Sequence, residues 1–108
     1  KQIYSTDRAF AALLEGGRVV TWGSGACGGD SSAVQKKLSG NVKQICSTDL
    51  AFAALLEGGG VVTWGHPAYG GDSSAVQEKL SGNPQIKQIY STERAFAALL
   101  EGGGVVTW

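Results

Sequence analysis

Short apolar runs alternate with glycine-rich stretches along the chain, a pattern typical of β-strands joined by tight turns. The run Val61-Val62-Thr63-Trp64 is β-branched and aromatic and predicts a strand. Because successive side chains on a strand point to opposite faces, Val62 and Trp64 share one face and the residues before each of them share the other. The glycines at positions 58–60 can adopt positive φ angles and predict a hairpin turn before this strand.

The segment before this turn can be interpreted as a strand or as a helix. Residues 51–56 are apolar on both faces, as in a strand buried between neighbouring sheets. The same region is rich in helix formers, with Thr48 as a possible N-cap and Gly58 as a possible end. We favour the strand because the glycine turn and the strand after it require a hairpin partner. Residues 43–48 predict a further short strand.

A more polar segment follows each Trp-ending strand and predicts one short helix. In residues 75–80 the apolar Val76 and Leu80 lie four positions apart, which places them on one helix face. Asp72 precedes this stretch and is a candidate N-cap. Residues 30–40 follow the same pattern.

These elements recur along the chain. The pattern of residues 1–22 returns at 43–64 and again at 87–108, so the period is first 42 and then 44 residues. The predicted units are residues 1–42, residues 43–86 and a half unit over 87–108. We expect a mainly β chain of tandem repeats, an incomplete array in which each unit packs against a unit like itself.

Composition and charge narrow the functional classes. The 108 residues include nine Lys+Arg and nine Asp+Glu, so the formal net charge is zero and no basic excess points to nucleic acid. No apolar run is long enough to span a membrane, and no leader peptide is visible in this stretch. Glycine accounts for 17 residues without the strict period of collagen, which agrees with repeated turns.

The pattern resembles the regulator-of-chromosome-condensation repeat across essentially the whole chain. The matching positions of the second unit are Val42, Ile45, Phe52, Ala54, Leu55, Gly59, Val61, Trp64, Gly65 and Gly70. The resemblance implies propeller-type blades of four antiparallel strands. It departs from the family where Ala51 replaces the usual histidine and where Gly-Gly-Asp-Ser-Ser follows the turn. No functional residue of the best-known member has a matching position here.

The loops after the Trp-ending strands carry the residues that differ most clearly between units. His66 and Tyr69 of the second unit stand where the first unit has Ser24 and Cys27. One histidine without clustered cysteines or carboxylates favours neither a metal site nor a catalytic set, so we expect no enzyme and no cofactor. Because loops carry specificity on repeat scaffolds, these four residues are the candidate partner-binding residues.

Two repeated positions allow a structural and a binding interpretation. The residues Trp22, Trp64 and Trp108 predict packing between blades, although a row of indoles can also stack a sugar or a base. Asp30 and Asp72 predict turns and helix caps, although backbone N–H groups at such a turn can also hold an anion. We favour the structural interpretation at both positions.

The two cysteines vary together. Cys27 occupies the position of Tyr69, and Cys46 occupies that of Tyr90, so one junction between units has two cysteines and the next has two tyrosines. This predicts that the two positions touch, as a Cys27–Cys46 disulfide in one junction and a Tyr–Tyr contact in the other, although two junctions also permit coincidence. A disulfide would place the protein in an oxidising, extracellular setting, and otherwise the compartment is undetermined.

The sequence therefore predicts a non-enzymatic repeat scaffold that binds another protein through its variable loops. The alternative is a self-assembling structural protein, in which near-identical repeats form a filament or a closed oligomer. The expected partners are a protein or further copies of the chain.

Overall fold

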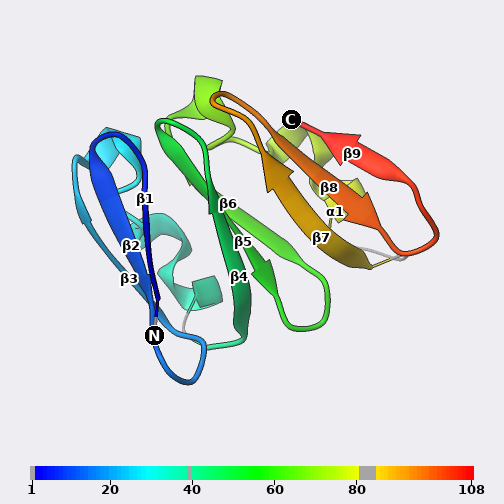
Figure 1. Ribbon diagram of the computed structural model, residues 1–108, viewed down its shortest axis with the longest axis horizontal. Helices are drawn as coiled ribbons and strands as arrows, with labels where there is room; N and C mark the ends of the chain where they lie inside the picture. The colour runs from blue at the N-terminus through cyan, green and yellow to red at the C-terminus, as the bar shows by residue number, and fades with distance from the viewer. Residues whose placement is uncertain (1, 39, 81–84) are drawn as a thin grey trace.

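The computed structural model describes residues 2–38, 40–80 and 85–108, which form three small antiparallel sheets with short helical turns between them. The first sheet comprises β1 (Gln2–Ser5), β2 (Ala9–Leu13) and β3 (Val19–Gly23); the second β4 (Val42–Ser47), β5 (Ala51–Leu56) and β6 (Val61–Gly65); the third β7 (Ile86–Ser91), β8 (Phe96–Leu100) and β9 (Val105–Thr107). Figure 1 shows the sheets side by side in chain order, as an open series and not a closed ring. The mainly β repeat architecture is confirmed.

The ambiguous apolar segment is a strand. In β5, Phe52 pairs with Trp64 of β6, and the register continues to Leu55 opposite Val61. Gly58 and its neighbour in the turn have φ angles of 94° and 92°, which suit glycine and close the hairpin. The hairpin pairing outweighs the helical propensity of residues 51–56, because the strand buries its side chains on both faces.

Each sheet presents two different apolar faces. We call front face the one that carries, in the first sheet, Ile3, Phe10, Ala12, Val20 and Trp22. The opposite face, which carries Tyr4, Ala9, Ala11, Leu13 and Val19, is called the back face. The residues at the equivalent repeat positions define the front and back faces of the second and third sheets. The back face of the first sheet packs against the front face of the second, and the back face of the second packs against the front face of the third. Two cores of the same design therefore lie between the three sheets.

Short helical turns follow the last strand of the first and second sheets. In the first unit these are η1 (Gly25–Cys27) and η2 (Ser32–Leu38), both of the 3₁₀ type. In the second unit they are η3 (Pro67–Tyr69), η4 (Ser74–Val76) and the α-helical turn α1 (Gln77–Leu80).

These turns correct one expectation and refine another. The family resemblance implied four-stranded blades, but each sheet has three strands in the described part of the chain. After β3 and β6 the chain bends into η1 and η3 instead of extending as a fourth strand. The predicted linker helix is present, mostly as 3₁₀ turns, and it buries Leu38 in the first core and Leu80 in the second.

The tryptophans join consecutive units. The Trp64 indole donates its Nε1–H to the carbonyl oxygen of Gly28 at 3.1 Å, and Trp108 donates likewise to Gly70 at 3.1 Å. Trp64 is buried and Trp108 is partly buried against the second core. The prediction of inter-blade packing is wrong for Trp22, which is 44% exposed, because no sheet covers the front face of the first sheet.

Candidate functional site

The variable loops meet the strand-connecting turns around one surface hollow of about 410 Å³. Its lining consists of Asp7, Arg8, Cys27, Asp49, Leu50, His66 and Tyr69. Three of the four predicted loop residues thus line one place. The fourth, Ser24, lies beside it and anchors the loop, since its N–H donates to the Arg8 carbonyl at 2.9 Å.

The turns that form one wall of this hollow are linked from sheet to sheet. The backbone N–H of Asp7 donates to the Asp49 carbonyl at 2.7 Å, and the N–H of Asp49 donates to the Glu93 carbonyl at 2.8 Å. These bonds align the β1–β2, β4–β5 and β7–β8 turns along one edge of the molecule. The side chains at this edge are therefore held on a regularly spaced backbone.

The loops that form the other wall are held in the same way in both units. Thr6 donates its hydroxyl hydrogen to the Cys27 carbonyl at 2.9 Å, and Thr48 donates to the Tyr69 carbonyl at 2.7 Å. Gly28 follows η1 with a φ of 106°, and a Cβ atom there would lie 2.5 Å from the Phe52 ring. The backbone of this region is thus shared between units while its side chains vary.

Tyr69 lies between an imidazole and a guanidinium group. The rings of Tyr69 and His66 meet edge to face, with centroids 5.1 Å apart. The Arg94 guanidinium carbon lies 5.2 Å from the Tyr69 ring centroid, within the range of a cation–π contact. His66 Nδ1 accepts the Ala68 N–H at 3.2 Å, so Nε2 carries the hydrogen when the ring is neutral.

The hollow combines charges of both signs with an aromatic ring. Asp7 and Asp49 supply carboxylates, Arg8 supplies a cation, and Tyr69 offers an aromatic ring with a polar hydroxyl. Aromatic rings and arginine are enriched where protein interfaces concentrate their binding energy. Among the described residues, no group of three or more His, Cys, Asp or Glu side chains is placed to hold a metal ion.

The predicted Cys27–Cys46 disulfide is not formed, and both cysteines are free thiols. The prediction compared equivalent positions of the repeat, but the two cysteines lie at different junctions. Cys46 packs between the second and third sheets, and Cys27 does not. The Cys46 thiol donates to the Ile89 carbonyl at 3.3 Å in the second core, whereas Cys27 lies beside the β1–β2 turn. Burial raises the pKa of the Cys46 thiol, and a hydrogen bond from Gln44 offsets part of this rise. Because the net shift is upward, the thiol stays protonated at neutral pH.

The expected contact between the Tyr69 and Tyr90 rings is not observed either. Tyr69 contacts His66 and Arg94, while the Tyr90 side chain is 55% exposed on the back face of the third sheet. Without the disulfide, the sequence carries no indication of an oxidising compartment.

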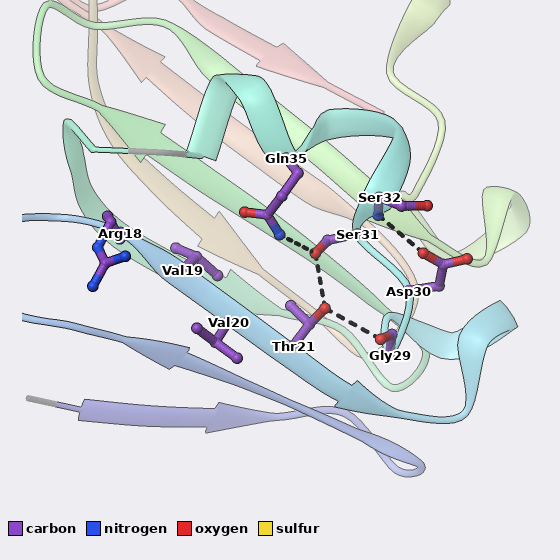
Figure 2. A pocket seen from close by; sticks show the side chains of 9 residues that line it. All are labelled: Arg18, Val19, Val20, Thr21, Gly29, Asp30, Ser31, Ser32 and Gln35. Carbon is purple, nitrogen blue, oxygen red and sulfur yellow. Dashed lines mark hydrogen bonds between the residues drawn. The ribbon is translucent and has the colours of Figure 1, made fainter.

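A second hollow, of about 460 Å³, lies along β3 and the linker after it (Figure 2). Thr21 donates to the Gly29 carbonyl at 3.2 Å and shares a 2.8 Å hydrogen bond with Ser31, which also accepts from Gln35 at 2.9 Å. Arg18 lies at the other end of the strand in Figure 2. The second unit repeats this arrangement through Thr63, Gly71, Ser73 and Gln77. Because both units form the same hydrogen bonds, we interpret these polar residues as structural parts of each linker.

The aspartates at this linker form the predicted turns, but the N-cap prediction is wrong for Asp72, because η4 begins at Ser74 and its N-cap is Ser73. Asp30 accepts the Ser32 N–H at 2.9 Å, and Asp72 accepts the Ser74 N–H at 2.9 Å. Hydrogen bonds from Ser32 to Asp30 and from Ser74 to Asp72 lower the pKa of these carboxyl groups below the ordinary value. The side-chain hydrogen bond has the larger effect and the backbone hydrogen bond the smaller one.

Sequence reasoning missed the turn residues that line the first hollow, and it missed Arg94, which contacts Tyr69 from the next turn. Asp7, Arg8, Asp49 and Arg94 were not predicted as site residues, although a signal for them exists. The turn before each small-residue strand reads Asp-Arg, Asp-Leu and Glu-Arg in successive units, so it varies as the loops do. Its variation gains meaning only when the fold brings it beside the loops.

Comparison with known proteins supports the fold. No protein-family model matches the chain, and no curated protein matches it. Among solved structures, it is similar to the entire ectodomain of the receptor kinase CR4 from Physcomitrella patens, with 18% sequence identity and a TM-score of 0.64. The match covers 98% of this chain and 29% of that ectodomain, so the chain spans less than a third of its length. In the described residues, no helix is both long and apolar enough to cross a membrane.

Proposed function

We propose that the protein is a non-enzymatic repeat scaffold of propeller-type units that binds a protein partner at the hollow between its variable loops and turns. One observation carries this proposal: Arg8 and Leu50 of the turns, and Cys27, His66 and Tyr69 of the loops, occupy positions that differ between units and line one hollow on a shared backbone. The two cores share nearly all their residues, whereas the loops and turns around the hollow differ between units where a partner can reach them.

The side chains at the hollow favour a peptide segment with both polar and aromatic character. Tyr69 is partly exposed and has Arg94 on its face, so it offers a preorganised aromatic surface at low cost in side-chain entropy. Asp7, Arg8 and Asp49 place charges of both signs around it. Mixed charge gives orientation and specificity to a bound segment more than it adds affinity.

The test is a selection of displayed peptides against the whole chain, followed by binding measurements on variants. Tyr69→Ala removes the ring, and His66→Ser installs the residue that the first unit carries at this position. We expect each change to weaken selected ligands at least about tenfold. Calorimetry or fluorescence anisotropy gives the dissociation constants.

The matched control is Lys79→Ala, an exposed change in the linker helix α1. It should leave the dissociation constant unchanged. Selected ligands that bind the Tyr69 and His66 variants as tightly as the parent would place recognition elsewhere and overturn the proposal, as would failure to select any ligand.

A further inference from the structure

The molecule leaves two different apolar faces open at its opposite ends. On the front face of the first sheet, Ile3 is 62% exposed and Phe10 is 45% exposed. On the back face of the third sheet, Val105 is 61% exposed and Tyr90 is more than half exposed. Every other front or back face is covered by a neighbouring sheet.

These open faces have the same residues as faces that already pack together inside the chain. The open front face carries Ile, Phe, Ala, Val and Trp, as does the covered front face of the second sheet: Ile45, Phe52, Ala54, Val62 and Trp64. The open back face repeats that of the first sheet residue for residue: Tyr90, Ala95, Ala97, Leu99 and Val105 stand where the first sheet has Tyr4, Ala9, Ala11, Leu13 and Val19. A contact between the open faces would reproduce the junction of the first two sheets at all ten positions.

The shapes of the faces also complement each other. Front faces carry the large Phe and Trp rings, which stack on each other, whereas back faces have alanines at their centre. The open back face contains a shallow hollow of about 180 Å³ whose lining includes Tyr90, Ala95, Ala97 and Thr107. In the internal cores, large side chains of one face pack against small side chains of the other. If two front faces met, their aromatic rings would lie against each other instead.

We propose that the front face of the first sheet binds the back face of the third sheet of a second copy of the chain. This contact is heterologous, so it continues head to tail from copy to copy unless the series closes on itself. Neither set of face residues includes a charged side chain, and the zero net charge of the chain adds no long-range repulsion between copies.

The contact should be weaker than an internal junction. The internal junction also buries Leu38 of η2, packs the partly buried Val34 against the core and contains the Trp64–Gly28 hydrogen bond, whereas the proposed contact uses sheet faces alone. The two halves of an internal junction are moreover joined by the chain, which raises their effective concentration. Association should therefore rise with protein concentration.

The experiment uses two variants, each with one face blocked. Ile3→Lys places a charge on the front face, and Val105→Lys places one on the back face. Each should raise the dissociation constant for self-association at least about tenfold, because the contact would bury an unpaired ammonium group. Mixed together, the two variants should form a one-to-one complex that grows no further, since each supplies the face that the other lacks. Sedimentation velocity and light scattering measure the masses.

Controls separate this outcome from general stickiness and from misfolding. Ala75→Lys, an exposed change in the linker, should associate like the parent. Val20→Lys and Tyr90→Lys form a second pair on the same two faces, and circular dichroism checks that each variant keeps its sheets. A parent chain that stays monomeric across about a hundredfold range of concentration contradicts the proposal. Association of the Val105 variant with itself, or no complex in the mixture, contradicts it equally.

Discussion

The first and second sheets carry the same residues on their front faces and use them differently. Phe10 and Trp22 stack with ring centroids 5.5 Å apart, and Phe52 and Trp64 stack at 5.4 Å. Yet Phe52 is fully buried and Phe10 is nearly half exposed. The local geometry is thus a property of the unit, while burial depends on the neighbouring sheet. Paired substitutions at equivalent positions isolate the contribution of that neighbour.

The largest difference should arise at the phenylalanines. Phe52→Ala empties a fully buried site in the first core and should lower the free energy of unfolding by about 3–5 kcal/mol. Phe10→Ala removes a half-exposed ring and should lower it by under about 1 kcal/mol. Urea denaturation at low protein concentration, where copies do not cover each other, measures both. Equal losses would show that the open face is covered in solution.

A smaller difference is expected at the tryptophans. Trp64→Phe removes the donor to the Gly28 carbonyl in a buried setting and should cost about 1–3 kcal/mol. Trp22 makes no equivalent hydrogen bond within the described residues, so Trp22→Phe should change stability by under about 0.5 kcal/mol. Thermal denaturation provides the measurement. If the two changes prove equally costly, the indole bond contributes nothing to the junction.

The smallest difference should appear at Asp30 and Asp72 of the linker turns, whose hydrogen bonds match in both units. Their pKa values are lowered in the folded state, so the ionised forms stabilise the fold above the ordinary Asp pKa of 3.8, and this contribution is lost as the pH falls through the folded-state pKa. Asp30→Asn and Asp72→Asn should each flatten the acid side of the stability profile, and by the same amount. Melting temperatures between about pH 6 and pH 2 test this. Unequal effects would mean that neighbouring sheets influence these aspartate turns as well.

The repeat period, the hairpins and the two faces of each strand could be predicted from sequence because they depend on local chemistry. Alternation places Val62 and Trp64 on one face, and glycine marks the turn. Alternation does not say which face has a neighbour, so the exposure of Trp22 was not foreseen. The linker of the first unit is too short for propensity to distinguish a 3₁₀ turn from an α-helical one.

The candidate site was predictable only in part for a related reason. Comparing repeats shows which positions are equivalent, and it identified Cys27, His66 and Tyr69 as variable. Equivalence carries no information on distance between units, and this is why the cysteine pair was misassigned. Arg94 reaches Tyr69 from the next unit, across a separation that only the stacking of the sheets closes.

The bonds between consecutive turns, from Asp7 to Asp49 and from Asp49 to Glu93, have a dynamic consequence. They couple each sheet to the next but not to the one beyond, so the molecule behaves as a short one-dimensional cooperative array. The middle sheet is hydrogen-bonded to a neighbour on both sides. Either outer sheet can therefore unfold locally while the middle sheet stays folded. Amide hydrogens of β5 should therefore exchange with solvent more slowly than those of β2 and β8, giving a gradient of local stability in a chain of nearly uniform sequence.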